Sequence, residues 1–196
     1  MILKEFAKDY FEEAERVLES VDIGDLESVV GLIWQAYKRG KTIYIFGNGG
    51  SAAIATHFAS DLNSTTIGHR KDFEGKRFKA VALTINVSEM TAWANDVGYK
   101  KIFSGQLENF VEEEDLVVGI SSSGNSWNVI EAVKLAKGKG ANSIGLTGMG
   151  GGKLKDAVDD CLVVDSDHYG QIEGTHSILC HLITFYLARR MKEGLE

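Results

Sequence analysis

Short apolar runs alternate along the chain with longer segments in which apolar side chains recur at helical spacing. The short runs are rich in β-branched and aromatic residues, which is typical of buried strands, and they lie at 42–46, 78–83, 116–120, 143–147 and 161–164. The helical segments between them lie at 52–62, 87–95, 101–111, 126–137 and 153–157. This order predicts an α/β fold: a three-layer, doubly wound sheet of five parallel strands with helices on both faces.

Helices are also predicted before the first strand and after the last. Residues 3–20 have helical periodicity, and a second helix at 26–38 is bounded by Asp25 as N-cap and Gly40 as a C-terminal stop. Ser88 is expected to open the helix at 87–95. A long helix at 171–192 ends the pattern, and its apolar side chains indicate that it is largely buried: Ile178, Leu179, Leu182, Ile183 and Phe185. We expect one domain, residues 1–196, with 1–40 as an N-terminal helical extension.

Composition and charge exclude several classes of protein. The chain of 196 residues is 44% hydrophobic and 25% charged, which is enough apolar material for a packed core. Its net charge is −7 and it has no basic run, so nucleic acid is not an expected partner. No segment resembles a membrane span or a signal peptide, so we expect a soluble cytoplasmic protein with no membrane partner. Cys161 and Cys180 are interpreted as small buried hydrophobic residues.

The 22 glycines are clustered, and two clusters directly follow predicted strands. Asn48, Gly49, Gly50 and Ser51 follow the first strand, and a polar loop with Ser121, Ser122, Ser123 and Ser126 follows the third. Ligands of open parallel sheets bind at the carboxyl ends of the strands, where hydroxyls and helix N-terminal amides bind phosphate. Neither loop has the spacing of a Walker or dinucleotide motif, so a sugar phosphate is favoured. The alternative is that these residues only cap helices and turn the chain.

Titratable side chains on two predicted helices could form a metal or acid–base site. His57 and Asp61 are four residues apart and therefore share a helix face. Glu173 and His181 lie on the last helix about 12 Å apart along its axis, and His176 offers a further donor. The alternatives are a surface His–Asp pair and the polar rim of an amphipathic helix. Asp96, beside Asn95, either binds substrate hydroxyls or stabilises a turn.

Five segments together resemble the sugar isomerase (SIS) domain superfamily, and within it the phosphoheptose isomerases. The motifs are FGNGGSA at 46–52, HFASDL at 57–62, ANDVGY at 94–99, GISSSGNS at 119–126 and GLTGMGGGKL at 145–154. The terminal helix with His176 and His181 completes a resemblance that covers almost the whole chain.

The resemblance implies a flavodoxin-like SIS fold and the interconversion of sedoheptulose 7-phosphate and D-glycero-D-manno-heptose 7-phosphate through an enediol. It also implies one zinc ion per subunit, and a homotetramer with sites at subunit interfaces, in which residues 1–40 take part in packing. The product would enter a glycan such as lipopolysaccharide, capsule or an S-layer glycan.

Roles are carried over from the family residue by residue. The loop serines match residues that contact phosphate and substrate, and the remaining residues that match substrate-binding positions are Asn48, Gly49, Gly50, Asn95 and Asp96. His57 matches a metal ligand, and His181 matches a ligand that is also an acid–base partner. Asp61 stands where the family has a Glu that is both ligand and base, and Glu173 stands where it has a Gln ligand.

The two departures leave the role of each carboxylate open. Asp61 is one methylene shorter than Glu, and Glu173 is charged where Gln is neutral. The expected metal ligands are His57, Asp61, Glu173 and His181, and the expected catalytic residues are Asp61, Glu173 and His181, with either carboxylate as the base. Two alternative functions are a non-catalytic SIS module that binds a phosphosugar or tethers partners, and an isomerase of another phosphosugar.

Overall fold

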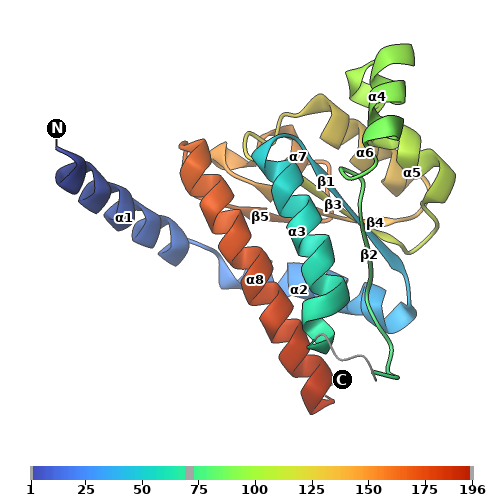
Figure 1. The fold of residues 1–196 in the computed structure, drawn as a ribbon, viewed down its shortest axis with the longest axis horizontal. Coiled ribbons are helices and arrows are strands. Elements are labelled where there is room, and N and C mark those ends of the chain that lie inside the picture. Colours follow the sequence, from blue (N-terminus) through green and yellow to red (C-terminus); the bar gives the residue numbers. More distant parts are fainter. Residues whose placement is uncertain (1, 69–72, 195–196) are drawn as a thin grey trace.

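Five parallel strands form one sheet in the order β2-β1-β3-β4-β5 (Figure 1). The computed structural model describes residues 2–68 and 73–194. The strands are β1 (Thr42–Gly47), β2 (Lys79–Ala82), β3 (Leu116–Ser121), β4 (Asn142–Thr147) and β5 (Asp160–Val163). The predicted α/β fold with five parallel strands is therefore confirmed. Each predicted strand is present, with its ends shifted by at most one residue.

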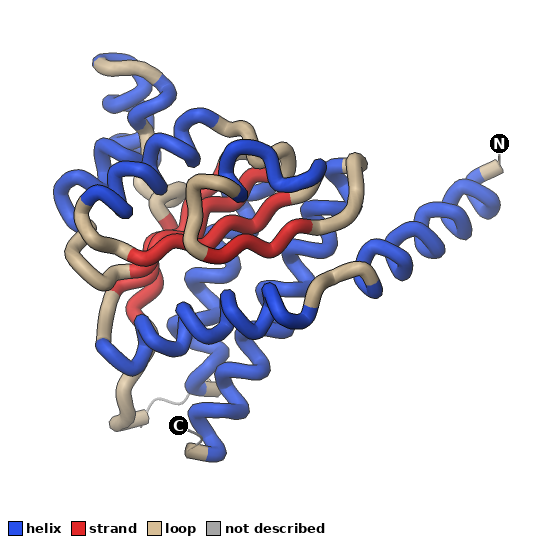
Figure 2. The backbone as a smooth tube through the Cα atoms, turned by 180° about the vertical axis from the view of Figure 1, so that it is seen from behind, coloured by secondary structure: helices blue, strands red, loops and turns tan. Residues whose placement is uncertain are grey.

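Helices cover both faces of this sheet, as the two opposite views show (Figures 1 and 2). One face packs against α2 (Ile23–Arg39), α3 (Gly50–Ser64) and α8 (Tyr169–Glu193). The other packs against α4 (Val87–Asp96), α5 (Ser104–Phe110), α6 (Trp127–Gly138) and α7 (Gly152–Lys155). Short 3-10 helices lie at η1 (Thr65–Ile67), η2 (Tyr99–Lys101) and η3 (Met149–Gly151).

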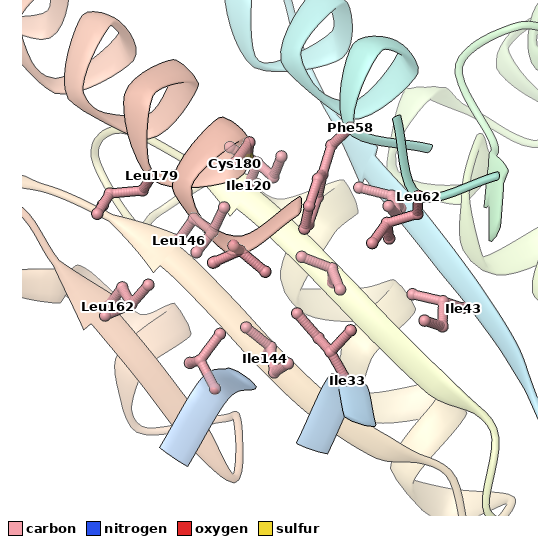
Figure 3. Close-up of a cluster of buried hydrophobic side chains, with 14 of the residues drawn as sticks. Ile33, Ile43, Phe58, Leu62, Ile120, Ile144, Leu146, Leu162, Leu179 and Cys180 are labelled. Carbon is pink, nitrogen blue, oxygen red and sulfur yellow. The ribbon is translucent and has the colours of Figure 1, made fainter. Parts of the chain in front are cut away.

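Successive side chains of each strand point to opposite faces of the sheet, which divides the hydrophobic core into two layers. In β1, Ile43 and Ile45 point into the layer beneath α2, α3 and α8, whereas Tyr44 and Phe46 point into the layer beneath α5 and α6. Figure 3 shows the first layer, in which Phe58 of α3 and Leu179 of α8 lie over Ile120 and Leu146 of the sheet. Burial on both faces explains why the strands read as nearly continuous apolar runs.

Helix α1 (Leu3–Glu19) projects away from the rest of the chain (Figures 1 and 2). Val17 is its one buried residue among those described. Two polar contacts tie the helix to the start of α8: Arg16 pairs with Asp165 at 3.1 Å, and the Gln171 side chain donates to the Tyr10 carbonyl at 3.1 Å. An isolated chain thus leaves the apolar face of α1 exposed, including Phe6 and Phe11.

Several local predictions were wrong. Helix α2 is capped by Asp22, whose carboxylate accepts from the Asp25 amide, so the helix begins one turn earlier than predicted. Asn86 caps α4 through the Glu89 amide in place of Ser88. The segment predicted as one helix at 101–111 is divided, with η2 ending at Lys101 and α5 beginning at Ser104. The predicted αL stop at Gly40, with φ of 69°, is confirmed.

Helix α8 is less buried than its composition predicts. Leu179 and Ile183 face the sheet, but Ile178, Leu182 and Phe185 are 48%, 46% and 62% exposed. A helix packed on one layer buries one stripe, and these three residues lie outside that stripe. In the described ranges, no helix is both long and apolar enough to cross a lipid bilayer.

The strand order places the polar loops next to each other. Helices α3 and α6 follow the neighbouring strands β1 and β3 but pack on opposite faces of the sheet. The carboxyl ends of β1 and β3 are therefore the topological switch point, where a doubly wound sheet opens a crevice for ligands.

Candidate functional site: a polar cavity beside a histidine–aspartate group

A cavity of about 260 Å³ lies at the switch point. Serines from both loops line it, together with residues from α8 and from the loop after β4: Asn48, Ser51, Ile120, Ser121, Ser122, Ser123, Ser126, Met149, Tyr169 and Glu173. The structure thus brings together the predicted serines of the two loops, which are separated by some seventy positions in the sequence. The lining is neutral apart from Glu173, so an anion bound there would be held by hydroxyls and backbone amides.

The hydroxyl groups in this cavity are not used to cap helices. The Ser126 side chain makes no capping bond to α6, and its hydroxyl accepts from the Ser121 hydroxyl at 3.1 Å. Helix α3 begins after Gly49, which has φ of 55° and no side chain to cap with. In the described chain, both N-termini therefore present first-turn amides without a capping side chain from the N-cap residue. Capping by the N-cap side chains therefore does not account for the two loops, although the Ser123 hydroxyl does stabilise a turn by accepting from the Asn125 amide.

Glu173 lies against the start of α3. A Cβ atom placed on Gly50 would overlap the Glu173 carboxylate, so only a residue without a side chain permits this approach. The carboxylate consequently enters the polar cavity instead of extending along α8 toward His181. Glu173 and His181 are two helical turns apart, about 12 Å along the axis, and their side chains do not converge within the described chain.

Three of the four expected metal ligands do converge. His57, Asp61 and His181 each offer one ligand atom, and these atoms all lie within 4.8 Å of one another. Asp61 Oδ2 is 3.5 Å from His57 Nε2 and 3.2 Å from His181 Nδ1. The two imidazole rings meet edge to face with centroids 4.8 Å apart. Helices α3 and α8 pack side by side (Figure 1), and this packing brings residues of the two helices into one group.

Two neighbours fix the Asp61 carboxylate and its surroundings. The Thr65 hydroxyl donates to Asp61 Oδ1 at 3.0 Å, which leaves Oδ2 facing the histidines. Burial, with a smaller contribution from the charge of Asp61, raises the pKa of the Cys180 thiol to about 12. Cys180 is therefore a neutral thiol at pH 7 and belongs to the core, as predicted. Cys161 is only half-buried.

This group fits a divalent transition metal. Two imidazole nitrogens and one carboxylate oxygen are ligands that such ions accept, and three protein ligands leave positions for substrate oxygens. His57 and His181 are 58% and 45% exposed, so the group is open to solvent on one side, whereas the Asp61 side chain is 13% exposed.

Other candidate residues lie outside both features. His176 is fully buried, and its Nε2 lies 3.1 Å from the Thr147 carbonyl, so it joins α8 to the end of β4 and is not part of the histidine–aspartate group. The Asn95 amide donates to the Asp96 carboxylate at 2.7 Å at the end of α4. Asp96 lines a separate cavity with Ala92, Trp93 and Val97.

Comparison with known families identifies the chain. The model of the SIS domain matches residues 9–148, which is more than half of the sequence. The chain belongs to the SIS-domain family. The family expected from the sequence is thereby confirmed.

The SIS domain described here has relatives that match along nearly its whole length. It is 42% identical over 177 residues to a protein named probable phosphoheptose isomerase from Thermoplasma acidophilum, covering 90% of this chain and 94% of that one. It is 39% identical over 171 residues to a phosphoheptose isomerase from Akkermansia muciniphila, covering 87% and 88%. The solved structure of a phosphoheptose isomerase from Neisseria gonorrhoeae superposes with a TM-score of 0.85 at 34% identity, covering 95% and 98%.

Sequence reasoning missed three residues around the sites of this SIS domain. Thr65 is four positions after Asp61, so helical spacing would have found it. Tyr99 and Asn128 contact Asn48, and nothing local in the sequence signals those contacts, because they depend on how β1, β3 and the segment after α4 meet.

Proposed function

We propose that this protein interconverts sedoheptulose 7-phosphate and D-glycero-D-manno-heptose 7-phosphate. The observation that supports this most directly is the 3.2 Å approach of His181 to Asp61, on α8 and α3, the two helices that also contribute Glu173 and Ser51 to the serine-lined cavity. The class of reaction, aldose–ketose isomerisation, was expected from the sequence and is confirmed by relatives named for it that match about nine-tenths of the chain. A module that only binds phosphosugars would not need the histidine–aspartate group.

The serine-lined cavity receives the phosphate. Hydroxyls of Ser51, Ser121 and Ser126 and the first-turn amides of α3 and α6 supply donors without a positive side chain. Neutral donors hold a phosphate ester while allowing product to leave, because no buried ion pair forms. Asn95 and Asp96 are proposed to contact substrate hydroxyls, and Asp96 does so from a cavity separate from this one.

The histidine–aspartate group receives the carbonyl end of the sugar. His57 lies six residues after Ser51 on α3, which places it on the order of 9 Å further along the helix axis. An extended chain of seven carbons ending in a phosphate ester spans on the order of 10 Å at about 1.5 Å per bond. The two features are therefore spaced for the two ends of one heptose phosphate.

We assign zinc to this group, with one ion per subunit held by His57, Asp61 and His181, and with Glu173 as a further ligand only if its side chain swings along α8. A bound zinc ion supplies Lewis-acid polarisation of the carbonyl and hydroxyl oxygens. All proton movements belong to residues of the chain.

Isomerisation requires one carbon proton to move between neighbouring carbons. A carboxylate removes the proton from C1 of the ketose, and the electron pair of the broken C–H bond forms the C1–C2 double bond of the enediol as O2 takes up a proton. His181 exchanges the protons on O1 and O2, and return of the carbon proton to C2 gives the aldose. Glu173 lies at the phosphate end in this structure, so it reaches C1 only after its side chain swings along α8 toward His181. We assign the base to Glu173 in that swung position and a ligand role to Asp61, which Thr65 holds.

We also propose a homotetramer with sites completed at subunit interfaces, in which residues 1–40 help to pack the subunits. The support is the apolar surface that a single chain leaves open on α1 and α8. Phe6 and Phe11 of α1 are 50% and 69% exposed, and Leu182 and Phe185 of α8 lie beside the histidine–aspartate group. An assembly through α8 would bury those residues and shield the site from water.

The proposed reaction is tested by following sedoheptulose 7-phosphate by NMR with wild-type protein and four variants. His181→Gln and Glu173→Gln should each lower kcat by about 10²–10⁴-fold, the usual contribution of an acid–base group. Glu108→Gln, an exposed residue of α5, is the matched control and should leave turnover unchanged. Wild-type turnover by His181→Gln would contradict its acid–base role. If Glu173→Gln retains turnover and Asp61→Asn loses it, the catalytic base is Asp61 and not Glu173.

A further inference from the structure

Two side-chain amides join the loops that line the polar cavity. Asn48, in the loop after β1, donates from Nδ2 to Asn128 Oδ1 at 2.9 Å. Asn128, in the first turn of α6, donates from Nδ2 to Asn48 Oδ1 at 2.7 Å. The pair therefore bridges the two neighbouring strands at the switch point, between helices that pack on opposite faces of the sheet.

Backbone contacts determine which way each amide faces. The Val129 amide donates to Asn128 Oδ1 at 3.1 Å, which identifies that atom as the oxygen. The Nδ2 group of Asn128 must then donate to Asn48, and the Asn48 oxygen also accepts from the Tyr99 hydroxyl at 3.0 Å. The Asn48 side chain is thus held by protein partners while Asn48 also lines the cavity.

Because the pair is largely buried, loss of either amide is costly. Asn128 is 3% exposed, and a buried carboxamide that loses its partner leaves an unsatisfied polar group that costs about 1–3 kcal/mol. Asn48 is followed directly by Gly49 and the first turn of α3, and Asn128 is two residues after Ser126. Any change in the spacing of the pair therefore moves the amides and hydroxyls that face the cavity.

We infer that Asn128 is a positioning residue. It acts through Asn48 to hold the loop after β1 and the loop after β3, residues 121–126 (the serine loop), at the separation that fits a phosphate group. This inference rests on the proposed function, because it assigns the phosphate of the substrate to this cavity. Asn128 itself is absent from the cavity lining and acts on the ligand only through its partner.

A double-mutant cycle tests the inference, with inorganic phosphate as the probe and isothermal calorimetry as the measurement. Asn48→Ala and Asn128→Ala should each weaken phosphate binding about tenfold, the effect of leaving one buried partner unpaired. The double variant should bind within about threefold of the weaker single variant, because both substitutions break the same pair. Additive losses, or wild-type affinity in Asn128→Ala, would overturn the inference.

Ser143→Ala is the matched control for general destabilisation. Ser143 is fully buried and its hydroxyl donates to Asp159 at 2.7 Å. It lies near the amino end of β4, whereas the cavity lies at the carboxyl ends of the strands. This variant should lower the melting temperature and leave phosphate affinity unchanged. A tenfold loss of affinity in Ser143→Ala would show that the effect of Asn128→Ala is only lost stability, which would overturn the inference.

Asn128→Asp provides a rescue. A protonated carboxyl group has the shape of the amide and can donate to Asn48 Oδ1, whereas the ionised form has no donor. With sulfate, which stays dianionic across the range, the affinity of Asn128→Asp should rise toward that of wild type as the pH is lowered from 7 to 4 and the carboxyl takes up a proton, while Asn128→Ala remains about tenfold weaker at each pH. An affinity of Asn128→Asp that stays equal to that of Asn128→Ala down to pH 4 would argue against the hydrogen bond and overturn the inference.

Binding of these anions requires no turnover, so the outcome is separable from the proposed reaction. Wild-type protein that binds phosphate in an Asn128-dependent manner but does not isomerise sedoheptulose 7-phosphate would refute the reaction and retain the inference. Wild-type protein that isomerises sedoheptulose 7-phosphate but binds neither anion would refute the inference and retain the reaction.

Discussion

Oδ2 of Asp61 lies 3.2 Å from Nδ1 of His181, although the two residues are 120 positions apart in the sequence. The contact exists because α3 and α8 pack side by side on one face of the sheet. Thr65 holds the other carboxylate oxygen, so the direction of Oδ2 is set before any ligand arrives. Such an outer partner typically changes metal affinity by about 10–100-fold when it is removed.

Substitution of Thr65 should therefore weaken metal binding without removing a ligand. We expect Thr65→Val to lower zinc affinity by about 10–100-fold and Asp61→Asn to lower it further, as measured by competition with a chelating dye. Thr66→Val is the matched control, since the Thr66 hydroxyl donates to the Leu62 carbonyl and not to Asp61. Zinc affinity that is equal in Thr65→Val and Thr66→Val would contradict the orienting role.

The loop after β4 should support the serine loop through glycine contacts. Gly124 has φ of 62°, and a Cβ atom there would overlap the Gly151 carbonyl oxygen. We expect Gly124→Ala to lower the free energy of unfolding in urea by about 3 kcal/mol or more, because backbone atoms cannot move aside cheaply.

Gly40→Ala separates backbone strain from this overlap. Gly40 has a similar φ of 69°, but its added Cβ would meet only the Lys76 side chain at ordinary contact distance. The cost there should be about 1 kcal/mol. Equal costs at the two positions would show that the packing of the two loops does not matter.

His176 should make the free energy of unfolding depend on pH. Burial lowers its pKa to about 4, whereas the unfolded chain has an ordinary histidine. As the pH falls below about 6.5, the unfolded state takes up a proton that the folded state does not, so stability decreases toward pH 4 by up to about 3 kcal/mol. His176→Gln retains a donor for the Thr147 carbonyl and should flatten this part of the curve. Identical pH profiles of urea unfolding for the two proteins would contradict the assignment.

The exposed stripe of α8 should control assembly. Phe185→Asp should reduce the mass measured by sedimentation, because it places a charge in the proposed interface. Phe110→Asp, at a 57% exposed site on α5 on the other side of the sheet, should leave the mass unchanged. An unchanged mass for Phe185→Asp would rule out α8 as the contact.

The sheet was predictable because parallel strands buried on both faces produce unmistakable apolar runs, as at Leu116–Ser121. Helix starts were less so. Asp22 and Asp25 are equally good N-caps by composition, and only the structure shows that Asp22 accepts from the Asp25 amide. The exposure of Leu182 and Phe185 was also hidden, because an apolar side chain reads the same in the sequence whether it is exposed or buried in a core.

The site was predictable only where its contacts are local. Four-residue spacing on a helix indicated the His57–Asp61 pair, and loop composition indicated the serines. The direction of Glu173 was not predictable, because it depends on the space that Gly50 leaves across the α3–α8 contact. Asn128 gave no signal, since a lone Asn in a helix acquires a role only when the loop after β1 meets it.

Solvent exchange tests the central claim, that a side chain removes a proton from the hydroxyl-bearing carbon next to the carbonyl. Sedoheptulose 7-phosphate is incubated with the protein in D₂O, with and without chelator, and followed by ¹H and ¹³C NMR. We predict that deuterium appears at the carbon beside the carbonyl in recovered ketose and in aldose product, and that His181→Gln reduces the exchange by about 10²-fold or more. Aldose formed with no deuterium in either sugar, or no exchange and no aldose at all, would contradict the enediol mechanism proposed for this site.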